Sequence, residues 1–95
     1  MFIRQSRTMS VDLSFAGVQF AKEDRQIELV HSVTEVTISA VSLEAQATMV
    51  ATHGDTELYR YYHSFKFTDG GYSITEQAYR SAIQRPELTG ATLVV

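Results

Sequence analysis

The chain has 95 residues, of which 44% are hydrophobic and 20% charged, and these values are typical of one small globular domain. The absence of cysteine excludes disulfides, thiolate zinc sites and thiol nucleophiles, and the net charge of -3, without a basic stripe, argues against duplex-DNA binding. The length predicts a single domain over residues 1–95. No apolar run is long enough to be a signal peptide or to span a bilayer, so we expect no membrane partner and a cytoplasmic location.

The N-terminal third has the alternation of a β-hairpin. Apolar and polar residues alternate over residues 8–20, and the phase changes after Gly17, which predicts a strand with a bulge or bend at that glycine. The charged residues 22–24 then predict a turn. Alternation resumes over residues 27–33, so we expect a second strand there, paired with the first.

Residues 34–52 are rich in β-branched side chains and predict a long third strand, with a change of phase at Ala40-Val41. A helix over residues 39–51 is the competing interpretation, because apolar residues there also fall at helical spacing and Ser39 could cap it. The β-branched content favours a strand. Residues 53–55, His-Gly-Asp, predict a tight turn into the next strand.

The fourth predicted strand, Glu57 to Phe67, has the clearest pattern in the chain. Its period of two separates an aromatic face from a polar face. We expect the aromatic face to be buried, and it comprises Tyr59, Tyr61, His63, Phe65 and Phe67; the opposite face comprises Arg60, Tyr62, Ser64 and Lys66.

A helix is expected after this strand. Ser73 and Glu76 match a capping box, and Pro86 should end the helix near Arg85. The apolar residues 91–95 predict a last strand that must be paired. The predicted fold is therefore α+β, in the order β-β-β-β-α-β: a bent antiparallel sheet of about five strands, with the helix on its concave aromatic face.

Candidate chemistry is sparse. His31 and His63 lie on the apolar faces of their predicted strands, where they could meet and bind a metal or exchange protons, but hydrogen-bonded core histidines are the favoured interpretation. Gly70-Gly71 could hold a phosphate before the helix, although Ser73 and Glu76 already satisfy the same backbone donors. We expect neither a metal nor a cofactor.

The favoured function is that of a non-enzymatic interaction or assembly protein that binds another protein or itself, with homo-oligomers expected. Arg60, Tyr62 and Lys66 are its candidate contact residues, because an exposed tyrosine between two bases offers apolar area and charge. The alternative is a small-ligand-binding protein or a simple acid-base enzyme, with a pocket between helix and sheet formed by His31, Tyr61 and His63. Single-stranded nucleic-acid binding ranks third, because the aromatic strand lacks the sequence motif of RNA-binding sheets and the chain is acidic.

Overall fold

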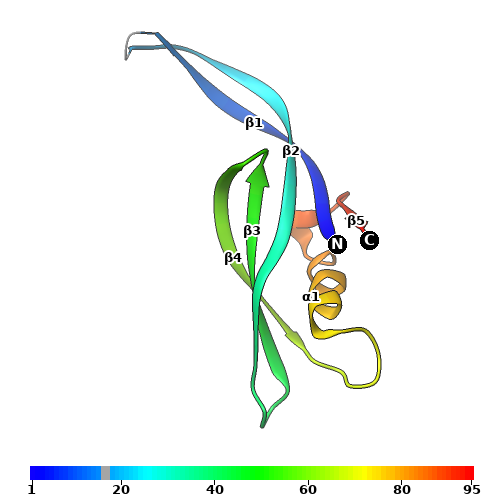
Figure 1. The fold of residues 1–95 in the computed structure, drawn as a ribbon. Coiled ribbons are helices and arrows are strands. Elements are labelled where there is room, and N and C mark those ends of the chain that lie inside the picture. The colour runs from blue at the N-terminus through cyan, green and yellow to red at the C-terminus, as the bar shows by residue number, and fades with distance from the viewer. Residues whose placement is uncertain (16–17) are drawn as a thin grey trace.

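One antiparallel sheet, with one α-helix against it, organises the chain (Figure 1). The computed structural model describes residues 1–15 and 18–95, with side chains for residues 1–8 and 23–95. The elements are β1 (Phe2–Phe15), β2 (Val18–Ile38), β3 (Glu44–His53), β4 (Thr56–Lys66), α1 (Ile74–Ala82), the 3-10 helix η1 (Pro86–Leu88) and β5 (Thr92–Val94). The sheet order is β4-β3-β2-β1-β5, which confirms the predicted α+β fold and its element order.

The predicted turn at residues 22–24 is wrong. These residues lie within β2 and pair with β1, with Lys22 opposite Asp12 and Asp24 opposite Ser10. A charged cluster is compatible with a strand whose side chains reach water, and Glu23 and Asp24 are both exposed. The bend that the sequence predicts at Gly17 lies outside the described residues.

The predicted long strand over residues 34–52 is also wrong, because β2 continues to Ile38 and a turn separates it from β3. The turn spans residues 39–43 and places Leu43 at a φ of 59°, which is an uncommon conformation for a residue other than glycine. The change of phase at Ala40-Val41 is therefore a chain reversal. The helical alternative for residues 39–51 is excluded as well, since most of them form β3.

A bulge interrupts β2 between Val33 and Glu35, where the register with β3 shifts by one residue. The amide of Val33 donates a hydrogen bond of 2.8 Å to the hydroxyl of Tyr79, which projects from α1. The helix thus satisfies a backbone donor next to the bulge. The turn between β3 and β4 is as predicted, because His53 pairs with Thr56 and Gly54 supplies a φ of 59° at the first position of a two-residue loop.

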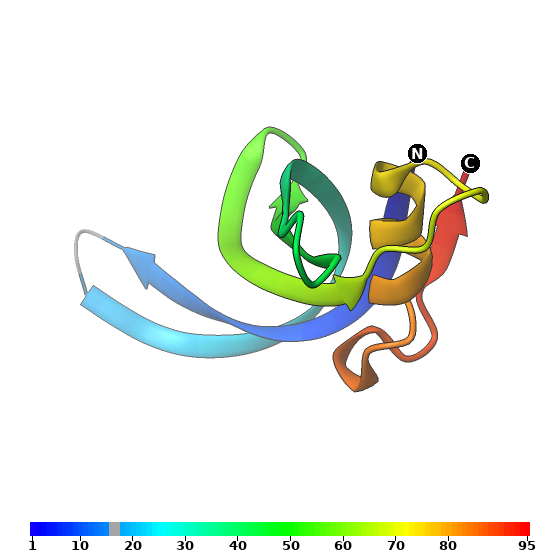
Figure 2. The ribbon, with the colours of Figure 1, turned by 90° about the horizontal axis from the view of Figure 1, so that it is seen from below.

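The sheet curls strongly, so that strands far apart in its order approach each other on its concave side (Figure 2). Arg7 of β1 donates a hydrogen bond of 3.2 Å to the hydroxyl of Tyr59 of β4, although β2 and β3 lie between these strands. The concave side holds the core, whose buried members are Ile3, Ala47, Met49, Ala78, Tyr79, Ala82 and Leu88. The predicted bent sheet with a helix packed on it is therefore correct, but Tyr59, which was expected on the buried aromatic face, is 37% exposed.

The helix of the C-terminal segment begins where the sequence predicts, but it ends earlier. The hydroxyl of Ser73 accepts a hydrogen bond of 3.2 Å from the amide of Glu76, which confirms the predicted N-cap. The Glu76 carboxylate forms an ion pair with Arg80 at 3.0 Å. The helix ends at Ala82, three residues before the predicted end, and Pro86 begins η1.

β5 pairs with residues 2–4 of β1, as the apolar C-terminal sequence requires. Among the described residues, no helix has the length and apolar character needed to cross a membrane.

Candidate functional site

A two-stranded ribbon extends from one end of the sheet, and we call it the arm (Figure 1). It consists of residues 8–15 of β1 and 18–26 of β2, which pair with each other from Thr8 opposite Gln26 to Phe15 opposite Val18. Within the described part of the chain these residues pair with no third strand, because β5 stops opposite Arg4 and β3 stops opposite Val30. The arm makes the molecule elongated, with extents of 55 × 23 × 22 Å.

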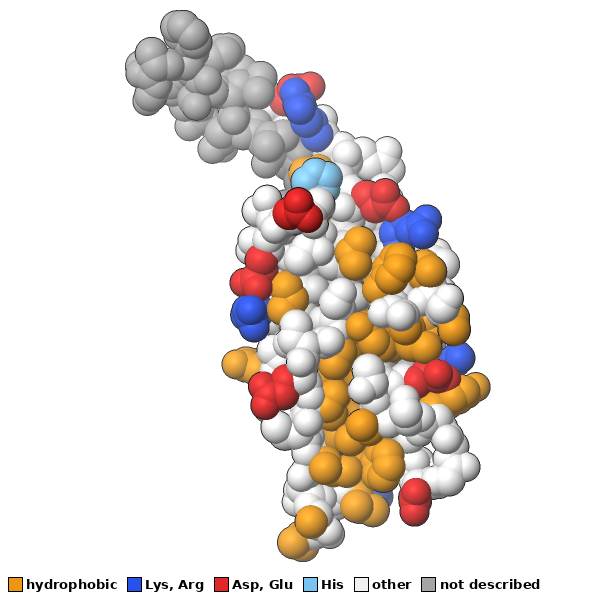
Figure 3. Space-filling view, viewed as in Figure 1, with side chains coloured by type: hydrophobic (Ala, Val, Ile, Leu, Met, Phe, Trp, Pro, Cys, Tyr) orange, Lys and Arg blue, Asp and Glu red, His pale blue; other side chains and the backbone are white. Residues whose placement is uncertain are grey.

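The opposite end of the molecule carries an exposed apolar turn. Ile38, Val41 and Leu43 lie at the β2–β3 turn, and Val41 is 96% exposed. Apolar side chains gather toward this end in the space-filling view (Figure 3). Single exposed apolar residues are ordinary on protein surfaces, but three within the six residues 38–43 form a small exposed apolar tip.

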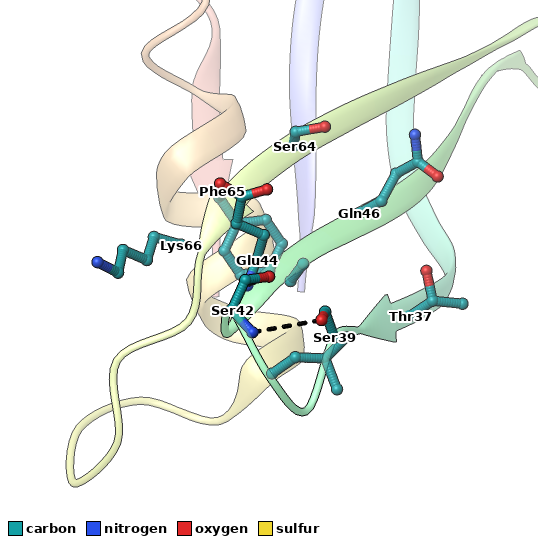
Figure 4. A pocket seen from close by; sticks show the side chains of 10 residues that line it. Thr37, Ser39, Ser42, Glu44, Gln46, Ser64, Phe65 and Lys66 are labelled. Atoms are coloured by element: carbon teal, nitrogen blue, oxygen red, sulfur yellow. Dashed lines mark hydrogen bonds between the residues drawn. The ribbon is translucent and has the colours of Figure 1, made fainter.

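An open hollow lies beside this turn, between β2, β3 and β4 (Figure 4). It has a volume of about 600 Å³ and a largely neutral lining, in which hydroxyl and amide side chains occur together with apolar ones such as Phe65. Its polar lining includes Thr37, Ser39, Ser42, Gln46 and Ser64. Glu44 and Lys66 are its charged residues and lie opposite each other in the β3–β4 register.

The predicted contact residues Arg60, Tyr62 and Lys66 all lie exposed on β4, as the alternation requires. Tyr62 is 65% exposed, and Arg60 forms an ion pair of 2.9 Å with Glu57. The structure therefore places the three residues on one accessible face. Their role in binding a partner stays a prediction.

Two buried polar side chains, Gln5 and His31, meet on the concave side of the sheet. This imidazole is 1% exposed, and both of its nitrogens are occupied by neighbouring side chains. Nδ1 lies 2.7 Å from the Tyr61 hydroxyl, and Nε2 lies 2.9 Å from Gln5 Oε1. Gln5 Nε2 in turn donates to the backbone carbonyl of Glu87 at 2.7 Å, so β1, β2, β4 and η1 meet in one hydrogen-bonded chain.

The chemistry of these partners sets the protonation of His31. The amide nitrogen of Gln5 faces a carbonyl, so its oxygen must face the imidazole and accept from Nε2–H. Nδ1 is then free to accept the proton of the Tyr61 hydroxyl. In this arrangement the imidazole is neutral. Burial and the nearby Arg7 guanidinium both lower the pKa of His31, which also favours the neutral form. Burial also raises the pKa of Tyr61 to about 12.

A cavity of about 240 Å³ opens beside this chain, and we call it the His31 cavity. Arg85 lines it, with its guanidinium carbon 5.2 Å from the centre of the Tyr61 ring and its Nη2 3.4 Å from the Glu87 carboxylate. The lining comes from three strands and the segment around η1, and comprises Arg7, His31, Tyr59, Tyr61, Arg85, Glu87 and Leu88.

His63 does not line the His31 cavity, so only two members of the predicted pocket trio, His31 and Tyr61, meet there. Its Nδ1 accepts from the Arg85 guanidinium at 3.2 Å, which leaves Nε2–H to donate to the Ser81 hydroxyl at 2.8 Å. Burial and the Arg85 charge lower the pKa of His63. His31 and His63 thus have separate polar partners, and among the described residues no group of three or more metal-ligating side chains gathers.

Sequence reasoning missed four polar residues of this region, namely Gln5, Arg7, Arg85 and Glu87. The first two lie before residue 8, where we expected the first strand to begin, and the last two flank the proline that was interpreted only as a helix stop. Continuing the alternation back from Met9 would have placed Gln5 and Arg7 on a common face.

Comparison of this chain with models of protein families, with curated proteins and with solved structures finds no match.

Proposed function

We propose that this chain is a non-enzymatic assembly protein that associates with further copies of itself through the arm. The observation that carries the proposal is the backbone pairing of residues 8–15 with 18–26, which continues well beyond the last contact of either strand with a third one. A two-stranded ribbon is marginally stable in water, and each of its outer edges has backbone donors and acceptors free to pair.

The amino-acid sequence of the arm supports the same function. It contains Met9, Val11, Leu13, Phe15, Val18 and Phe20 within twelve residues. A partner that adds a strand or a layer to the ribbon would complete its hydrogen bonding and bury apolar surface. When identical chains associate, the commonest closed assembly is a two-fold dimer.

A shortened arm tests the proposal directly. Replacing residues 10–24 by Asn-Gly joins Met9 to Arg25, which already face each other across the hairpin, through a turn sequence that favours two-residue loops. The buried residues Ile3, Gln5, Leu29 and His31 are retained, so the domain should stay folded. We expect sedimentation equilibrium to give an oligomer for the full chain of 10.7 kDa and a monomer for the shortened one.

Val41→Ser provides the matched control, because it removes the most exposed apolar side chain at the other end of the molecule and leaves the arm intact. It should preserve the oligomer. A full chain that sediments as a monomer at micromolar concentration would refute self-association, and a shortened chain that still forms the oligomer would place the contact outside the arm.

The polar face of β4 is a second candidate surface within the same proposal. Arg60, Tyr62 and Lys66 offer one large apolar side chain between two cations, and such residues contribute most when a partner buries them. Charge reversal at Arg60 and Lys66 should weaken partner binding without unfolding the domain.

A further inference from the structure

The His31 cavity has a feature that the assembly proposal does not use: two arginines line it. Arg7 donates to the neutral hydroxyl of Tyr59, and among the described side chains no carboxylate forms an ion pair with it. Its guanidinium carries five N–H groups, so most of them remain available. Arg85 is more occupied, because it also donates to the Tyr62 carbonyl at 3.1 Å and to His63.

The charges around the cavity add up to about one positive charge. The two guanidinium groups contribute two positive charges, and Glu87, whose pKa is lowered by hydrogen bonds from its own backbone and from Arg85, contributes one negative charge. His31 is neutral in its hydrogen-bonded arrangement, and burial raises the pKa of Tyr61 to about 12, so neither group adds a charge. A singly charged anion balances this site, whereas a doubly charged phosphate would leave excess negative charge beside Glu87.

The remaining lining is suited to an apolar group. Leu88 is 3% exposed, and the rings of Tyr59 and Tyr61 lie at tilted planes with their centres 5.8 Å apart. The volume of about 240 Å³ lies below the range of roughly 300–1,000 Å³ that holds drug-sized ligands. An occupant therefore has one ring or a short chain.

We propose that the His31 cavity binds a small organic monocarboxylate, with the carboxylate on Arg7 and its apolar body against Leu88, Tyr59 and Tyr61. Guanidinium and carboxylate groups match in geometry and can form two parallel hydrogen bonds. The Arg85 charge adds attraction. This site is separate from the assembly proposal, because Arg7 lies before the residues that the shortened arm removes.

Titration calorimetry with benzoate tests this site, with benzamide as the uncharged analogue of the same shape and inorganic phosphate as the competing anion class. We expect saturable binding of benzoate and weaker binding of the other two. Arg7→Gln should weaken benzoate binding by about tenfold or more, since a charge-assisted hydrogen bond is lost. Arg7 is exposed, so circular dichroism should report an unchanged fold.

Arg4→Gln is the matched control, because Arg4 lies three residues earlier on the same strand, forms an ion pair with Glu28 and does not line the cavity. Its affinity for benzoate should equal that of the unmodified chain. The proposal is overturned if benzoate shows no saturable binding, if benzamide or phosphate binds as tightly, or if Arg7→Gln and Arg4→Gln behave alike. The shortened-arm chain should bind benzoate normally whatever its oligomeric state.

Discussion

Replacing Tyr79 by phenylalanine would remove one oxygen atom that joins the helix to the sheet. Tyr79 is 4% exposed, and its hydroxyl accepts the hydrogen bond from the Val33 amide at 2.8 Å, next to the β2 bulge. The register is interrupted at this bulge, so the backbone donor depends on a side chain. Tyr79→Phe keeps the ring and its packing, and it isolates the contribution of this hydrogen bond.

The expected cost follows from what happens to the Val33 amide. A buried donor left without a partner costs about 1–3 kcal/mol, and Val33 is half-buried, so part of this cost is relieved by water. We therefore expect the free energy of unfolding to fall by about 1–2 kcal/mol. For a domain of this size each kcal/mol lowers Tm by roughly 4–8 °C.

Urea denaturation measures the change, and Tyr62→Phe is the matched control. Tyr62 is 65% exposed, so loss of its hydroxyl should change the stability by less than about 0.5 kcal/mol. Hydrogen exchange gives an independent measurement, because the Val33 amide should exchange faster in Tyr79→Phe. Equal stability of the two variants, with unchanged exchange at Val33, would refute the proposed role of the hydroxyl.

Three further predictions concern the helix start, the faces of β4 and the effect of pH. Ser73→Ala should lower the free energy of unfolding by about 1 kcal/mol through loss of the N-cap, and an unchanged urea midpoint would contradict this. Phe65→Ala should lower the free energy of unfolding by about 2 kcal/mol, which is less than for a fully buried ring because Phe65 is half-buried. Tyr62→Ala should change it by less than about 0.5 kcal/mol. A larger loss of Tm for Tyr62→Ala than for Phe65→Ala would mean that the two faces of β4 are exchanged. His31 and His63 have pKa values below the ordinary 6.5, so the unfolded chain takes up protons first on acidification. Tm should be constant between neutral pH and about pH 9 and should fall as the pH drops below 6.5, and a profile that stays flat in acid would contradict neutral buried histidines.

Some of the fold could be predicted because its signals are local. Alternation along β4 separates Phe65 from Tyr62 without reference to any other strand, and the cap at Ser73 and the turn at Gly54 each depend on a few adjacent residues. In such places the side-chain chemistry and the backbone geometry agree.

The strand boundaries between residues 22 and 43 were wrong for a different reason. The turn at residues 39–43 contains no glycine or proline, and Leu43 adopts the left-handed conformation. Serine side chains support it, since the Ser39 hydroxyl accepts from the Ser42 amide at 3.3 Å. The bulge next to Val33 changes the phase within one continuous strand, and a change of phase in the sequence alone is equally compatible with a strand end.

The His31 cavity depends on the curl of the sheet, which no single segment encodes. Gln5 and Glu87, which are joined by a hydrogen bond, are 82 residues apart, and Arg7 and Tyr59 are 52 apart. Their contact requires inner side chains of β1 to reach across to β4 and η1. A flat sheet of the same sequence and register would keep Arg7 and Tyr59 at least three strand spacings apart, which is roughly 14 Å, and would leave no cavity. The alternation of each strand predicts which side chains face inward. The curl itself needs the register shifts near Val33 and Thr52, because bulges locally increase the twist of a sheet and so help its inner face to close on itself.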